Sequence, residues 1–199
     1  MLVIITFLFI FISFDIQAQN CPDGWNSNII TNTFHLPNGN DCEGYIMYCW
    51  RDYNGNREIF VTAVGFLDKT CLYGTDINNP YFWELCDITI LNYEANLPNS
   101  NNEHLSVSPC SEKTFIVSVD KKSCWKYINN ANNSVDFVQC ENIQGNCLKE
   151  YSLCWDYSSQ IPALIITNVQ LPPVCVLCET GYIYNPEIPE SPCFSNCSN

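Results

Sequence analysis

The chain has 199 residues, and its 21 acidic and 8 basic side chains give a formal net charge of −13. Nucleic acids and anionic membrane surfaces select basic patches, so this charge argues against both as partners. The many Asn, Tyr, Ile and Val residues argue against a helical bundle and favour strands joined by polar turns.

The N-terminus carries an apolar run from Leu2 to Phe14, followed by the small-residue exit Ala18-Gln19. These features predict a secretory signal peptide over residues 1–19. The run is shorter than the roughly 20 apolar residues of a membrane helix, and no second long apolar stretch follows it. We therefore expect a secreted, soluble mature chain without a membrane span, located extracellularly, in a periplasm or at a cell surface.

An internal repeat is the most informative pattern downstream. Residues 42–53 align with residues 147–157, and each segment holds two cysteines with six residues between them and a tryptophan directly after the second. A degenerate third copy surrounds residues 124–127. Side chains alternate between the two faces of a strand, so a cysteine and the tryptophan after it point in opposite directions. We expect the tryptophans to be at least half-buried, namely Trp50, Trp125 and Trp155.

The first copy predicts a β-hairpin, with strands over residues 45–52 and 58–67 and a tight turn at Asn54-Gly55. The segment from Asp52 to Glu58 also presents oxygen ligands at alternate positions, as a calcium loop does. Its glycine comes too early for such a loop, however, and the hairpin explains the same residues with fewer assumptions.

The later elements follow the same logic. Residues 81–93 are interpreted as a strand, although their apolar spacing also fits a helical turn, and residues 96–108 as a polar connection. Residues 114–120 alternate as a half-buried strand does. In the last copy, strands over residues 149–157 and 163–171 flank a short polar turn.

Short hairpins cannot bury their apolar faces alone, so the units are expected to pack together. The sequence predicts a mostly β fold, either a disulfide-stapled sandwich of two sheets or two small β modules of repeated hairpins. The expected boundaries are a first β unit over residues 20–100, a second over 101–175, and an irregular cystine-rich tail over 176–199. Residues 182–184 are the only part of the tail expected to resemble a strand.

The fourteen cysteines all follow the predicted signal peptide, and their even number and density are typical of an exported disulfide framework. Zinc is the competing interpretation, but it would require a second CxxC pair or nearby histidines. We expect disulfides at every cysteine and no metal or other cofactor. The cysteines are Cys21, Cys42, Cys49, Cys71, Cys86, Cys110, Cys124, Cys140, Cys147, Cys154, Cys175, Cys178, Cys193 and Cys197.

Catalytic signatures are weak. His35 and His104 stand alone, and no Gly-x-Ser-x-Gly elbow is present. The Cys175–Cys178 CxxC follows two prolines, a context that favours a structural bridge over a thiol oxidoreductase. Paired carboxylates for glycoside hydrolysis stay open, because such acids can lie far apart in sequence. We therefore predict no catalytic residue and no enzyme activity.

The function expected from the sequence is a secreted structural or macromolecule-interacting protein of a matrix or cell surface. A glycan-binding module is the alternative, because Tyr, Trp, Asn and Asp supply flat apolar faces and polar groups for sugars. A small secreted hydrolase comes third. The expected partner is an extracellular protein or a glycan, or a second copy through self-association, and the binding residues are not identified by any motif.

Overall fold

The structure is a computed structural model that describes residues 21–96, 107–141, 145–158, 163–168 and 182–195. It confirms a mostly β chain in which nine strands form one sheet. The elements are β1 (Asn26–His35), β2 (Asp41–Tyr53), β3 (Asn56–Phe66), η1 (Lys69–Leu72), α1 (Pro80–Asn96), β4 (Phe115–Lys122), β5 (Cys124–Asn129), β6 (Val135–Gln139), β7 (Asn146–Asp156), β8 (Ala163–Asn168) and β9 (Phe194–Ser195).

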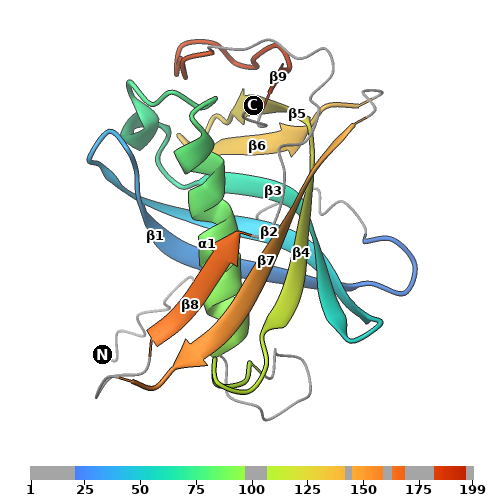
Figure 1. Ribbon diagram of the computed structural model, residues 1–199. Helices are drawn as coiled ribbons and strands as arrows, with labels where there is room; N and C mark the ends of the chain where they lie inside the picture. Colours follow the sequence, from blue (N-terminus) through green and yellow to red (C-terminus); the bar gives the residue numbers. More distant parts are fainter. Residues whose placement is uncertain (1–20, 97–106, 142–144, 159–162, 169–181, 196–199) are drawn as a thin grey trace, which may run out of the picture.

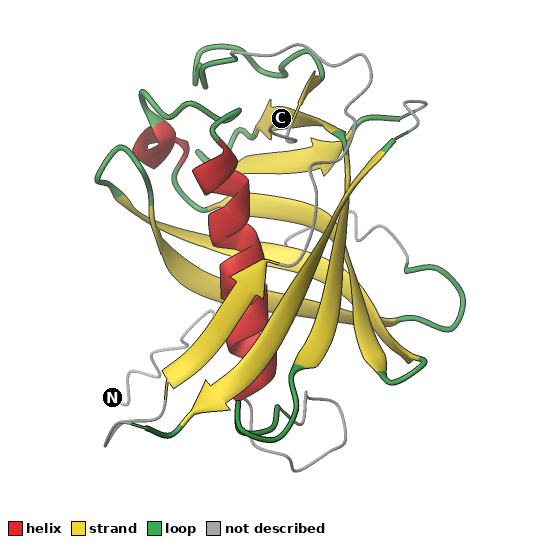
Figure 2. Cartoon of the chain, in the orientation of Figure 1, coloured by secondary structure: helices red, strands yellow, loops and turns green. Residues whose placement is uncertain are grey.

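The sheet curls around α1, and both β1 and β8 contact the helix (Figures 1 and 2). We call the side of the sheet that faces α1 the inner face and the opposite side the outer face. The expected two-sheet sandwich is not confirmed: the described strands belong to a single sheet, and its second layer is α1.

The strand expected over residues 81–93 was a wrong prediction, because this segment lies within α1. Phe82, Cys86 and Ile90 are all buried and recur every four residues, the spacing that places side chains on one side of a helix. The aromatic and β-branched composition of the segment favoured a strand, whereas the spacing of its apolar residues indicated the helix.

The hairpin expected at Asn54-Gly55 is confirmed by β2 and β3, which pair antiparallel up to Tyr53 and Asn56. Asn54 and Gly55 have φ values of 52° and 80°, the left-handed pair that a two-residue hairpin turn requires. The last predicted hairpin is confirmed as well, because β7 and β8 pair antiparallel.

β3 joins the two expected units of the chain. Along one edge it pairs with β2; along the other, Arg57–Phe60 pair parallel with β4 and Ala63–Phe66 pair antiparallel with β6. The sheet is therefore continuous across the boundary expected between residues 100 and 101.

On the outer face at this junction, a side chain of β2 packs tightly over a glycine of β3. The ring of Tyr45 passes over Gly65, where a Cβ atom would lie 2.3 Å from Tyr45 Cε1. The Tyr45 hydroxyl then donates a hydrogen bond to Asp136 on β6 at 2.6 Å. Only a glycine at position 65 leaves room for this contact.

The core lies between α1 and the inner face. Trp83 of α1 packs against Trp125 of β5 with ring centroids 5.0 Å apart, and Phe82 packs against Phe137 of β6 at 5.5 Å. Trp50 and Trp125 are buried and Trp155 is intermediate, so all three tryptophans that follow a cysteine are at least half-buried, as expected.

Four disulfides tie the described residues together, and Cys124 and Cys147 are disulfide-bonded as well. The prediction was wrong at Cys86, which is a buried free thiol on the core side of α1. Cys175, Cys178 and Cys197 lie outside the described residues. The four bridges are Cys21–Cys49, Cys42–Cys71, Cys110–Cys154 and Cys140–Cys193.

The described part of the C-terminal tail is attached to the sheet. Cys193 is bridged to Cys140, and the adjacent β9 pairs with β5. Ile183 makes one isolated bridge to Asp76, so β9 and not residues 182–184 is the regular strand here. In the described ranges, no helix has the length and apolar character needed to cross a membrane.

Candidate functional site

A hollow of about 350 Å³ opens on β1, β2 and β3, and we call it the β1–β3 hollow. Ile29 is 46% exposed while its neighbour Ile30 is 3% exposed, which places Ile29 on the outer face and Ile30 in the core. The lining mixes apolar side chains with hydroxyl and amide groups, and it comprises Cys21, Ser27, Asn28, Ile29, Met47, Tyr48 and Thr62.

A β-bulge lies at the hollow. Met47 pairs with Ala63 and Tyr48 pairs with Val61, so Thr62 is left without a partner in the register. Its hydroxyl instead donates to the carbonyl of Met47 at 3.1 Å. A bulge interrupts the ladder and re-aims side chains, so it explains why this part of the sheet is hollowed.

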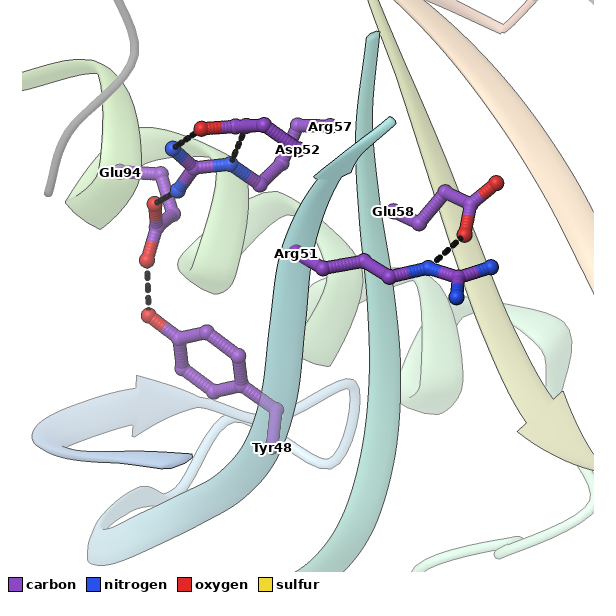
Figure 3. Close-up of polar contacts among 6 residues, drawn as sticks. All are labelled: Tyr48, Arg51, Asp52, Arg57, Glu58 and Glu94. Carbon is purple, nitrogen blue, oxygen red and sulfur yellow. Dashed lines mark hydrogen bonds and ion pairs between the residues drawn. The ribbon is translucent and has the colours of Figure 1, made fainter. Parts of the chain in front are cut away.

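Arg51 of β2 lies beside the hollow, near the β2–β3 turn, and has two aromatic neighbours. The Arg51 guanidinium is 4.6 Å from the ring centroid of Trp25 and 5.1 Å from that of Tyr53. Arg51 Nε also donates to Glu58 at 2.6 Å (Figure 3). Tyr53 is 53% exposed, so this group, which we call the Arg51 shelf, presents an aromatic ring and an ion pair to solvent.

A buried polar network connects the hollow to α1. Glu94 of α1 accepts hydrogen bonds from the Tyr48 hydroxyl and, at 2.6 Å, from Arg57 (Figure 3). Arg57 also donates to Asp52 at 2.6 Å, and its guanidinium lies 3.9 Å from the ring centroid of Trp50. Arg57 and Glu94 are 1% and 0% exposed, so the pair is held inside the core.

The same network fixes the position of Tyr48. Its hydroxyl accepts a hydrogen bond from Asn28 Nδ2 at 2.9 Å while it donates to Glu94. Burial first, and then the charge of Glu94, raise the pKa of Tyr48 above its ordinary value. Tyr48 therefore stays a neutral donor, and two lining residues of the hollow are held in fixed positions.

A second buried polar network joins α1 to β4 and β7. Asp87 of α1 accepts hydrogen bonds from Lys121 of β4 and, at 2.9 Å, from the Tyr151 hydroxyl of β7. Asp87 is 0% exposed and Lys121 and Tyr151 are each 1% exposed. The carboxylates of Asp87 and Glu94 thus both serve the packing of the helix on the sheet.

Of the two histidines weighed for catalysis, the structure describes His35. The side chain of His35 is 79% exposed, and its Nδ1 lies 2.5 Å from Asp41. Burial raises the pKa of the Cys86 thiol to about 12, so this cysteine is a poor nucleophile. Among the described residues no three His, Cys, Asp or Glu side chains are grouped to hold a metal ion. His104 and the Cys175–Cys178 pair lie outside the described residues.

The calcium-loop alternative receives no support from the geometry. Asp52 accepts from Arg57, and Glu58 accepts from Arg51, each across the hairpin. The two carboxylates therefore have cationic partners on different sides of the hairpin and do not converge on a common point.

Sequence reasoning did not identify the hollow or the Arg51 shelf as a site. One signal was present: residues 24–40 contain no Asp, Glu, Lys or Arg in a chain with 29 such residues. This uncharged stretch includes β1, which forms one side of the hollow. Comparisons with protein-family models, with curated proteins and with solved structures gave no match, so the residues alone carry the functional argument.

Proposed function

We propose that the chain is an exported, non-catalytic module that binds another macromolecule, in the first place a protein. The observation that carries this proposal is the outer face of β1–β3. There the hollow and the Arg51 shelf lie side by side along the same strands.

The frame around this face is rigid, which suits recognition. Cys21–Cys49 crosses from the segment before β1 to β2, and Cys42–Cys71 ties the start of β2 to η1. The Glu94–Arg57 pair holds the same hairpin to α1. A site whose side chains are fixed before binding loses less conformational entropy when a partner docks.

The distribution of acids supports a non-catalytic role. Hydrolysis by a carboxylate pair needs two acids that face a substrate, with one of them free to give up a proton. Asp87 and Glu94, the two fully buried carboxylates among the described residues, are instead hydrogen-bonded to a cation and a tyrosine each. The four disulfides fit a protein that matures outside a reducing cytosol, which supports export.

Glycan binding is the second candidate, and the Arg51 shelf favours it. Sugars stack on exposed aromatic rings, and their hydroxyls accept hydrogen bonds from a guanidinium and donate them to a carboxylate. The exposed ring of Tyr53 beside Arg51 and Glu58 offers this combination.

Two parallel binding screens on the purified protein test the proposal: a displayed library of random peptides and a glycan array. Saturable binding to peptides supports the first candidate. Saturable binding to a sugar that Tyr53→Ala abolishes and Tyr157→Ala preserves supports the second; Tyr157 is a matched control because it is 58% exposed. The absence of saturable binding in both screens would contradict the proposal, as would catalytic turnover of a sugar or peptide.

A further inference from the structure

The strand β1 presents a long backbone edge. Its ten residues pair with β2 on one side, and no described residue pairs with the other side. Seven of the ten residues are exposed, including the consecutive Thr31, Asn32 and Thr33. The N–H and C=O groups along such an edge can pair with another extended chain.

A hydrogen bond to Asn28 shows which backbone groups of β1 point away from β2, toward the open edge. The backbone N–H of Ile29 donates to the side chain of Asn28 at 2.9 Å and therefore points away from β2. The N–H and C=O of one residue point to the same side of a strand, and the direction alternates along the chain. Ser27, Thr31 and Thr33 thus direct their backbone groups to the open edge, as Ile29 does.

The sequence of β1 lacks the features by which edge strands usually prevent unwanted pairing. Such strands are commonly short, or carry lysine, proline or an inward-pointing charge. β1 contains none of the charged residues Asp, Glu, Lys and Arg, and the prolines nearest to it, Pro22 and Pro37, lie outside the strand. β-branched residues, which favour strands, make up four of its ten positions.

The acidic residues around the open edge of β1 favour a basic partner. Asp23 at one end of β1 and Asp41 and Glu43 at the other are exposed. Arg51, the cation beside β1, is paired with Glu58, and the chain carries a net charge of −13. A second copy would bring the same acids against these ends, whereas a basic segment would complement them.

We propose that β1 binds an extended, basic segment of a partner polypeptide as an added strand. One apolar side chain of that segment enters the β1–β3 hollow beside Ile29, and its Lys or Arg residues lie near Asp23, Asp41 and Glu43. Strand addition of this kind takes affinity from backbone hydrogen bonds and specificity from a side-chain pocket. The inference rests on the proposed function and adds the site and the chemistry of the partner.

The test uses peptides selected from the display library on the wild-type chain, synthesised with a fluorescent label and measured by anisotropy. Ile29→Asp places a charge at the hollow. Thr31→Pro removes one N–H from the open edge, where proline is tolerated because no ladder bond is lost. Leu148→Asp is the matched control, because Leu148 is 41% exposed on β7, a strand that pairs with β4 and β8.

We expect selected peptides rich in Lys or Arg, with Ile29→Asp and Thr31→Pro each weakening binding by at least about tenfold and Leu148→Asp leaving it within about twofold. Peptides that bind both β1 variants as tightly as the wild type would overturn the edge site while leaving the binding function standing. A library that yields no binder would overturn the inference and, together with an empty glycan array, the proposed function as well. A dimer in light scattering that Thr31→Pro dissociates would also overturn the inference, because the occupant would then be a second copy.

Discussion

Replacing Glu94 by leucine tests how the polar network supports the fold. The variant removes the carboxylate that accepts from Arg57 and Tyr48, both of which are 1% exposed. Removing one partner of a buried ion pair costs about 3–5 kcal/mol, because the other charge stays inside without compensation. Asp52 still accepts from Arg57 in this variant. We therefore expect a loss near the lower end, about 3 kcal/mol.

Urea unfolding followed by tryptophan fluorescence, with the disulfides intact, measures this loss as a shift of the midpoint at constant slope. Glu58→Gln is the control, because it breaks the Arg51–Glu58 pair at the surface, where such pairs contribute about 0–1 kcal/mol. A Glu94→Leu variant that loses no more than the Glu58→Gln control would refute the claim that the network holds α1 to the hairpin.

Three further outcomes are expected. The Cys86 thiol should resist iodoacetamide in the folded chain and react after unfolding in guanidinium, since burial raises its pKa to about 12; peptide mapping that finds Cys86 alkylated under native conditions would contradict its placement. Gly65→Ala should cost about 1–3 kcal/mol in urea unfolding and almost nothing in a Tyr45→Ala background, and an equal cost in both backgrounds would exclude the crossing of Tyr45 over Gly65. Burial raises the pKa of Asp120 in the folded chain. Its contribution to stability is therefore present below the ordinary pKa of an aspartate and is lost as the pH rises through the folded pKa. The stability of Asp120→Asn relative to the wild type should increase with pH between these two pKa values, and a pH-independent difference would contradict the assignment.

Local sequence signals predicted the hairpins and not their assembly. The β2–β3 turn requires a left-handed backbone at two consecutive residues, which few residue pairs adopt. The pair Asn54-Gly55 was therefore sufficient to predict this turn from the sequence. The branching of β3 between β4 and β6 depends on pairings between residues more than fifty positions apart, which no local pattern encodes.

The helix and the free thiol were missed for a related reason. In the segment of α1, residue composition and apolar spacing pointed to different structures, and burial on one side of the helix decided between them. Cys86 belongs to that apolar side, so it fills the core as a small hydrophobic residue instead of forming a bridge.

The candidate site could be predicted only in part. The absence of charge over residues 24–40 is visible in the sequence. The hollow itself arises from the bulge at Met47 and Tyr48, and a bulge is set by the register between two strands. The pairing of Asp52 and Glu58 with arginines also appears only once the hairpin is folded.

Backbone amide hydrogen exchange, with and without a selected peptide, tests most directly the claim that a partner binds along the open edge of β1 beside the β1–β3 hollow. This claim predicts slower exchange on binding at Thr31 and Thr33, whose amides point to the open edge, and unchanged exchange in β7. Protection that appears elsewhere on the chain, with Thr31 and Thr33 unaffected by a saturating peptide, would contradict it.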